Sequence, residues 1–204
     1  VLVLSPWNYP FNLSMNPVVA ALAAGNCVVL KPSSKVPATA AFLADLLGSV
    51  FDPSEVAVVQ GGHDVSDALL ELPFDHVFFT GSPPIGRRVM AAAAKHLATV
   101  TLELGGKSPA IVDAGADLRV AAERILWGKF VNAGQTCIAP DYLLIDARIE
   151  DAFLDEARKV LAERYGATDA DREASESFCR IVTRESWDRL RALLDRAVAS
   201  GAKV

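Results

Sequence analysis

The sequence has few cysteines, and their positions exclude a disulfide-stapled fold. Of 204 residues only three are cysteine, namely Cys27, Cys137 and Cys179. They are odd in number, widely spaced and without a C-x-x-C pair, whereas small secreted domains carry cysteine densely. This usage fits a reducing compartment, so we predict a cytoplasmic protein.

Long hydrophobic runs and blocks of positive charge are also missing. The longest apolar run, residues 18–24, is far shorter than the roughly 20 residues of a transmembrane helix. The chain has 20 Lys and Arg against 25 Asp and Glu, a net charge of -5, and no basic cluster that would neutralise phosphates. The opening lacks the basic start of a signal peptide. We therefore expect neither a membrane nor nucleic acid as a partner.

Apolar residues are abundant instead. The composition is 51% hydrophobic and 22% charged, which excludes a disordered chain. A length of 204 residues suffices for one large core or one and a half small domains. The chain does not begin with Met and stops directly after a helical pattern. We therefore expect a segment of a longer protein.

Apolar runs of strand length alternate with helix-length patterns over the first half of the chain. The predicted strands are residues 1–4, 27–30, 56–59, 76–79 and 100–104, and the predicted helices are residues 12–24, 37–50, 65–72 and 84–97. This alternation is typical of βαβ units that build a parallel sheet. The sequence therefore predicts an α/β fold with a doubly wound, Rossmann-like parallel sheet.

The pattern changes after Gly105-Gly106. Strands are predicted there at residues 110–112 and 142–145, helices at residues 118–131, 149–165 and 185–200, and a polar loop at residues 166–176. We therefore expect one domain over residues 1–106 and the start of a second α/β domain over residues 107–204.

The G-x-G-x-x-G motif of many dinucleotide-binding sheets is absent. The nearest glycine-containing turn, Gly81-Ser82-Pro83-Pro84-Ile85-Gly86, lies between the fourth predicted strand and its helix. Backbone N–H groups at that helix start could face a phosphate, although the two prolines remove two donors. The alternative is a plain turn.

Cys137 lies in the small polar stretch Asn132-Ala133-Gly134-Gln135-Thr136-Cys137. A free thiol is mostly protonated at neutral pH, so a nucleophilic cysteine needs a neighbouring base or hydrogen-bond donors. The residues alone leave a nucleophile and a buried structural cysteine both open. Cys27 is expected in the core, inside an apolar strand, and Cys179 is expected to be half-buried.

Polar residues also lie near the ends of three predicted strands: Glu103 inside the strand at 100–104, and Asn8 and Lys31 after the strands at 1–4 and 27–30. Glu103 is either exposed at a sheet edge or placed at the carboxyl edge, where α/β sheets bind ligands and a carboxylate can act as a general base. Asn8 is either a turn residue or a donor to an oxyanion, and Lys31 either meets a ribose or phosphate or is solvated. The histidines share no metal-ligand spacing, so no metal is expected.

Five motifs, in this order, resemble the aldehyde dehydrogenase superfamily. They are SPWNYPFN at residues 5–12, LKPS at 30–33, FTGS at 79–82, ELGGKSP at 103–109 and GQTC at 134–137. Residues 89–109 and 127–142 are most similar to its class 3 branch, which handles aromatic and medium-chain aliphatic aldehydes. The resemblance runs along the whole chain.

The resemblance implies an enzyme that oxidises an aldehyde to a carboxylic acid with NAD or NADP. Cys137 would attack the carbonyl to form a thiohemiacetal, and the Asn8 side chain with the Cys137 N–H would hold its oxyanion. Hydride would leave for the nicotinamide. Glu103 would then activate the water that hydrolyses the thioester.

The resemblance also implies that residues 1–106 form an NAD(P)-binding domain and residues 107–204 part of the catalytic domain. Lys31 would bond the adenine-side ribose, and the Gly81–Gly86 turn with Ser82 would meet the pyrophosphate. Family members that prefer NAD often carry Glu where Ser34 stands, so we expect NADP to be accepted. The implied cofactor contacts are Trp7, Lys31, Ser33, Ser34, Gly81, Ser82, Gly86, Leu104 and Gly105.

Family chains are longer than this one, and a homodimer is expected for the complete protein, with a small-molecule aldehyde as substrate. One alternative is an aldehyde dehydrogenase that passes its acyl group to coenzyme A. Glu103 argues against it because hydrolysis needs that base. A second alternative is a noncatalytic truncated subunit, which the intact Cys137, Glu103 and Asn8 disfavour for the parent protein.

Overall fold

The chain folds into two compact units, each with its own sheet. A computed structural model describes residues 1–203. The first unit runs from Val1 to Gly105 and the second begins at Gly106. The first unit contains two hydrophobic clusters and the second contains one.

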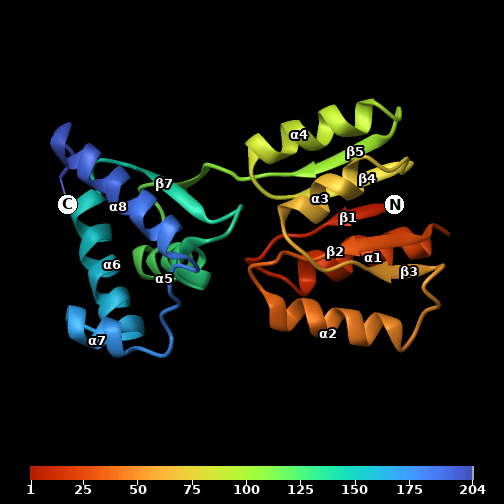
Figure 1. Cartoon of the computed structure of the whole chain (residues 1–204). Coiled ribbons are helices and arrows are strands. Elements are labelled where there is room, and N and C mark those ends of the chain that lie inside the picture. Colours follow the sequence, from red (N-terminus) through yellow and green to blue (C-terminus); the bar gives the residue numbers. More distant parts are fainter. Residues whose placement is uncertain (204) are drawn as a thin grey trace. The chain divides into compact units, whose positions relative to one another are not determined.

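The first unit contains a parallel sheet of five strands in the order β3-β2-β1-β4-β5 (Figure 1). The strands are β1 (Leu2–Leu4), β2 (Val28–Lys31), β3 (Val56–Val58), β4 (His76–Thr80) and β5 (Thr99–Glu103). The chain moves outward from β1 through β2 to β3, crosses back to β4 and ends at the opposite edge with β5. The predicted doubly wound, Rossmann-like sheet is confirmed.

Four helices cover the two faces of this sheet. They are α1 (Asn12–Ala23), α2 (Pro37–Gly48), α3 (His63–Leu70) and α4 (Pro83–Ala94). Successive strand residues point to opposite faces. Leu2 and Leu4 accordingly join the core under α3 and α4, whereas Val3 joins the core under α1 and α2. Because both faces are covered, β1 is apolar at every position.

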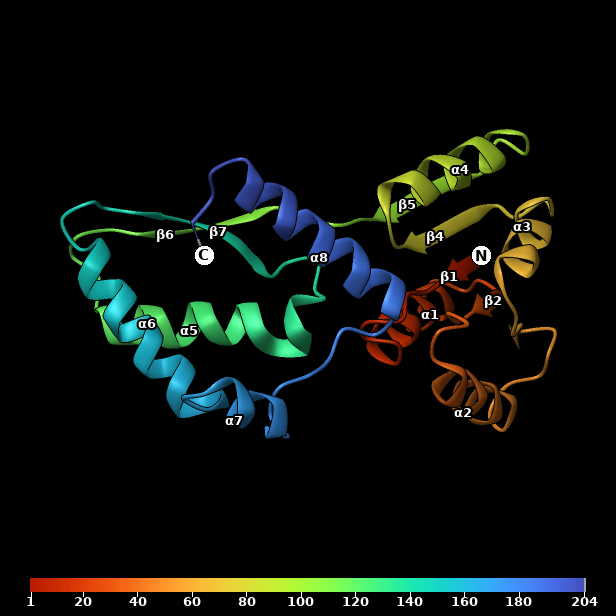
Figure 2. The ribbon, with the colours of Figure 1, turned by 60° about the vertical axis from the view of Figure 1, so that its left-hand side comes forward.

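The second unit pairs β6 (Ser108–Val112) with β7 (Pro140–Ile145) in parallel. Helices α5 (Leu118–Phe130) and α6 (Glu150–Tyr165) pack against each other beside this sheet (Figure 2). A short 3-10 turn (Val131–Gly134) follows α5, and α7 (Asp169–Ala174) and α8 (Arg184–Ala199) end the unit. The core consists of Val112, Ala122, Phe153, Ala157 and Val160 with their half-buried neighbours.

Three sequence predictions are wrong in detail. Residues 166–176 are not a continuous loop, because Thr168 and Asp171 form a reciprocal capping box that starts α7. Cys27 is exposed because β2 begins one residue later, at Val28. Cys179 is exposed as well, in the connection between α7 and α8.

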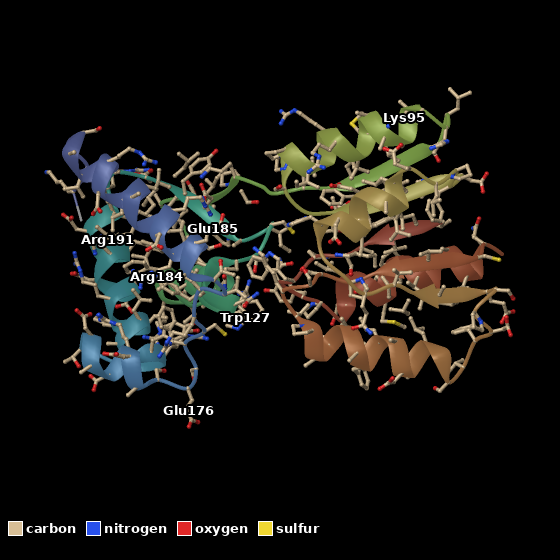
Figure 3. All side chains as sticks on the ribbon, viewed as in Figure 1. Lys95, Trp127, Glu176, Arg184, Glu185 and Arg191 are labelled. Atoms are coloured by element: carbon tan, nitrogen blue, oxygen red, sulfur yellow. The ribbon has the colours of Figure 1, made fainter. Side chains whose placement is uncertain are left out.

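Helix α4 approaches β5 closely because Gly86 carries no side chain. A Cβ at Gly86 would lie 3.0 Å from Leu104 Cδ2 and 3.7 Å from Leu102 Cδ1. Two ion pairs at 2.8 Å also link α4 and the residue after it to α3 and the residue after it: Arg88 with Asp67, and Lys95 (labelled in Figure 3) with Glu71. All four charged side chains are more than half exposed, so these pairs contribute little stability.

We expect Gly86→Val to lower the free energy of unfolding by about 1–3 kcal/mol, because the added methyl groups overpack the contact with β5. Gly48→Val is the matched control, since Gly48 is also helical and a Cβ there meets nothing within 4 Å. Urea unfolding of both variants measures the difference. Equal losses for the two would contradict a packing role for Gly86.

Candidate functional site

A pocket of about 290 Å³ opens at the carboxyl ends of β1, β2 and β4 in the first unit. The strand order reverses between β1 and β4, which is where doubly wound sheets bind ligands. The lining brings together six of the nine predicted cofactor contacts, namely Trp7, Lys31, Ser33, Ser34, Gly81 and Ser82. These residues come from three separate motifs of the sequence.

The pocket combines apolar and polar lining. Leu4 and Phe79 contribute from the sheet, Leu70 from α3, and Ile85 and Val89 from α4. All five belong to the hydrophobic core under α3 and α4 or pack against it. A flat ring could lie on such a surface, while hydroxyl and charged groups around it meet polar substituents.

Lys31 is the most buried charged group of this pocket. It ends β2 and is only 6% exposed. Since Leu30 faces the core under α1 and α2, Lys31 points to the opposite face, toward the pocket. Burial lowers the pKa of Lys31, and the nearby carboxylate of Asp64 opposes that shift. The ammonium can therefore compensate its burial by donating hydrogen bonds to a ligand.

Three further basic side chains and one carboxylate, that of Asp67, line the pocket, and none of them was singled out from the sequence. The Nζ of Lys35 lies 5.8 Å from the centroid of the Trp7 ring, within the range of a cation–π contact. His63 lines the pocket at the start of α3, and Arg88 lines it from α4 while paired with Asp67. The adjacency of Lys35 to Ser34 was the signal available in the sequence. Asp67 offsets Arg88, and the remaining basic groups, Lys31, Lys35 and His63, favour an anionic ligand.

The start of α4 has fewer backbone donors than most helices. Ser82 is its N-cap, with an extended backbone, and Pro83 and Pro84 have no N–H. A Cβ at Gly81 would lie 2.5 Å from Phe79 Cζ, so any larger residue here would have to displace that ring. The Ser82 hydroxyl and the first amides beyond the prolines are the groups left for a phosphate.

Five predicted site residues of the first unit lie outside the pocket lining. Gly86 and Leu104 contact each other, and a Cβ at Gly105 meets nothing within 4 Å. Glu103 is the exposed last residue of β5, and its carbonyl accepts a hydrogen bond of 2.9 Å from the Gly81 N–H. Asn8 is half-buried in the connection between β1 and α1.

In the second unit, Cys137 follows a strained turn. Asn132, Ala133 and Gly134 have φ values of 51°, 53° and 74°, so three consecutive residues adopt the left-handed conformation. For a residue with a Cβ this conformation costs about 1–2 kcal/mol, and alanine has no polar side chain to offset the cost. Cys137 itself is half-buried. Strain of this kind persists only where surrounding contacts enforce it.

Close contacts fix the chain on both sides of Cys137. A Cβ at Gly106 would lie 2.4 Å from the Cys137 carbonyl oxygen, so only glycine permits this approach of two backbones. Asp141, at the start of β7, pairs with Lys107 and, at 3.9 Å, with Lys129. The hydrogen bond from Lys107, with the nearby charges of both lysines, lowers the pKa of Asp141.

Within residues 1–203, the part of the chain that the structure describes, no helix is long and apolar enough to cross a membrane. Within the same residues, no group of three or more His, Cys, Asp or Glu side chains could hold a metal ion.

We expect Lys31→Met to raise the free energy of unfolding at pH 7, because it removes the cost of burying an ammonium and keeps the side-chain length. Burial holds the pKa of Lys31 in the folded chain below that of an unfolded lysine, about 10.4. Between these two pKa values the folded state binds fewer protons than the unfolded state, so the free energy of unfolding of the unmodified chain rises with pH. The gain should therefore shrink as the pH approaches 10. Urea unfolding across this range measures it, and Lys35→Met, at an exposed position, should show no such trend.

The comparisons with known proteins agree on one family. The family model described as "Aldehyde dehydrogenase family" matches residues 1–204. The "Putative aldehyde dehydrogenase AldX" of Bacillus subtilis is 48% identical over 203 residues, which is 100% of this chain and 45% of that protein. The "Aldehyde dehydrogenase, dimeric NADP-preferring" of Rattus norvegicus is 48% identical over 202 residues, 98% of this chain and 44% of its own. Family 3 members from Homo sapiens and Arabidopsis thaliana are also 48% identical, so the resemblance to the class 3 branch is confirmed.

Solved structures are similar along the whole chain as well. The substrate-bound AldH of Staphylococcus aureus has a TM-score of 0.89 at 44% identity, covering 97% of this chain and 43% of its own. A Mycobacterium tuberculosis aldehyde dehydrogenase complexed with NAD+ has a TM-score of 0.89 at 30% identity, covering 99% and 42%. The chain thus spans less than half the length of the proteins it matches. It belongs to the aldehyde dehydrogenase family.

Proposed function

We propose that this chain supplies the cofactor pocket and the nucleophile of an enzyme that oxidises an aldehyde to a carboxylic acid with NAD or NADP. The observation that carries the proposal is the pocket at the switch point of the sheet, lined by Lys31, Ser34 and Ser82. The identity of 48% to proteins named aldehyde dehydrogenases supports the reaction.

The pocket fits a dinucleotide in its chemistry. Its apolar lining suits an adenine ring, the buried Lys31 can donate to ribose hydroxyls, and Ser82 at the start of α4 can meet the pyrophosphate. Relatives are named for both cofactors, one as NADP-preferring and another as complexed with NAD+. Trp7, Ser33, Gly81, Gly86, Leu104 and Gly105 are proposed as the further contacts or supports. The bound cofactor supplies the acceptor for hydride.

The chain's own residues carry the remaining steps. The thiol of Cys137 gives its proton to Glu103 or to water as its sulfur bonds to the aldehyde carbon, and the Asn8 amide with the Cys137 N–H stabilises the negative oxygen left when the carbonyl π bond breaks. After hydride has left that carbon, Glu103 takes a proton from a water molecule whose oxygen attacks the thioester. The carbon–sulfur bond breaks, releasing the acid and restoring the thiol of Cys137.

The organisation, substrates and location of the protein are part of the same proposal. Residues 1–106 would form the NAD(P)-binding domain and residues 107–204 part of the catalytic domain. The substrates we propose are aromatic or medium-chain aliphatic aldehydes, as the resemblance to the class 3 branch implies, and the relative named dimeric supports a homodimer. The free state of Cys27, Cys137 and Cys179 supports the cytoplasm.

Cys137→Ala should abolish NADH and NADPH formation with benzaldehyde or hexanal, because no other group would form the thioester. Cys27→Ala, which removes an exposed thiol of the first unit, is the matched control and should keep full activity. Absorbance of the reduced cofactor measures both. Turnover that survives in Cys137→Ala would refute the nucleophile, and acyl-coenzyme A formed on adding coenzyme A would favour the acylating alternative.

Ser34→Glu should weaken NADP binding about 10- to 100-fold while NAD binding changes little, because a carboxylate there would repel the 2'-phosphate. Ser34→Gln adds nearly the same bulk without charge and should preserve the NADP affinity. Isothermal titration calorimetry gives both dissociation constants. An equal loss for both substitutions would show that space, and not charge, governs this position.

A further inference from the structure

The side-chain amide of Gln135 connects two segments of the second unit that are far apart in the sequence. Its Nε2 donates to the Asn132 carbonyl at 2.9 Å and to the Arg180 carbonyl at 3.1 Å, and its Oε1 accepts from the Val182 N–H at 3.0 Å. The Gln135 backbone N–H also donates to the Asn132 carbonyl, at 3.1 Å. The amide thus uses both donors and its acceptor on main-chain groups. We refer to these three side-chain hydrogen bonds as the Gln135 clamp.

One end of the clamp is the left-handed turn that precedes Cys137. The carbonyl that receives two hydrogen bonds from Gln135 belongs to Asn132, the first of three residues with positive φ. Ala133, the next residue, has φ 53° and gains nothing from its own side chain in this conformation. The clamp therefore closes the turn from outside and offsets part of its strain.

The other end of the clamp is anchored to aromatic side chains of α5 and α6. Phe178, two residues before Arg180, packs against Phe130 of α5 and Tyr165 of α6, with ring centroids 6.0 and 5.5 Å apart. The Arg180 guanidinium donates to the carbonyls of Phe178 and Glu173. The segment from Phe178 to Val182 is thus held by two helices on one side and by Gln135 on the other.

We propose that Gln135 is a positioning residue that fixes the backbone on which Cys137 is presented. The clamp ties the strained turn to a segment anchored on α5 and α6, so the loop cannot relax to an ordinary conformation that would turn the Cys137 backbone. This inference rests on the proposed function of Cys137 as the nucleophile. Only an amide supplies both donors and an acceptor here, since a carboxylate would face two carbonyl oxygens and an alanine would reach neither segment.

Gln135→Glu and Gln135→Ala should each slow alkylation of Cys137 by iodoacetamide at pH 7 about tenfold, the scale of one or two lost hydrogen bonds. Peptide mapping by mass spectrometry follows Cys27 in the same molecules, and its rate should stay unchanged. Gln60→Glu makes the same charge change at an exposed position of the first unit and is the matched control. An unchanged or faster reaction of Cys137 in both Gln135 variants would overturn the inference.

A second substitution tests whether the clamp acts through the turn. Ala133→Gly removes the penalty of positive φ, so in the Gln135→Ala background it should restore Cys137 reactivity to within about threefold of the unmodified chain. Hydrogen exchange should show faster opening of residues 132–138 in Gln135→Ala and retained protection in α5 and α6. Failure of the rescue, or lost protection throughout α5 and α6, would overturn a positioning role.

The alkylation rates of the three cysteines in the unmodified chain distinguish failure of this inference from failure of the proposed function. If Cys137 reacts no faster than Cys27 or Cys179 there, the nucleophile assignment fails, while the exchange data still report on the clamp. If Cys137 is fast and the Gln135 variants match it, the nucleophile stands and the clamp fails.

Discussion

The pairing of β1 with both β2 and β4 is the constraint on which the rest of the first unit depends. Leu2 and Val3 are completely buried, one facing each core, and burial of such a side chain contributes about 1.5–3 kcal/mol. β1 lies at the centre of the sheet, with β2 and β3 on one side and β4 and β5 on the other. The loop after β1 leads to α1 on one face of the sheet, and the loop after β4 leads to α4 on the opposite face. The pocket lies where they part.

Glycines permit three close approaches of the main chain at or beside predicted site residues. Gly81, Gly86 and Gly106 each stand where a Cβ would lie 3.0 Å or less from a neighbouring atom, and each brings a backbone close to a different partner. At Gly81 the partner is an aromatic ring of the pocket, at Gly86 a neighbouring strand, and at Gly106 the carbonyl of Cys137. The sequence contains no G-x-G-x-x-G, yet the third-glycine role of that motif, close packing of helix on strand, is performed by Gly86.

Sequence reasoning succeeded where the signal is periodic and failed where it depends on distant partners. The strands and long helices were predicted within a few residues because apolar spacing marks them, but α3 begins at His63, before the first apolar residue on which its prediction relied. Strand ends located the pocket, since parallel strands share one carboxyl edge. Gln135 escaped because its partners Arg180 and Val182 lie 45 and 47 residues away, and nothing local marks such hydrogen bonds.

Two features that cost stability involve a predicted cofactor contact and the turn before Cys137, and this bears on function. A buried ammonium at Lys31 and an alanine in the left-handed region at Ala133 are both unfavourable choices for a chain selected only to fold. Methionine at the first position and glycine at the second would relieve each cost with little rearrangement. Natural chains tolerate such local penalties where the same atoms do other work, and a surplus elsewhere, here in the central sheet, compensates them. Lys31 lies in the pocket of the first unit, and Ala133 lies in the turn that precedes Cys137 in the second.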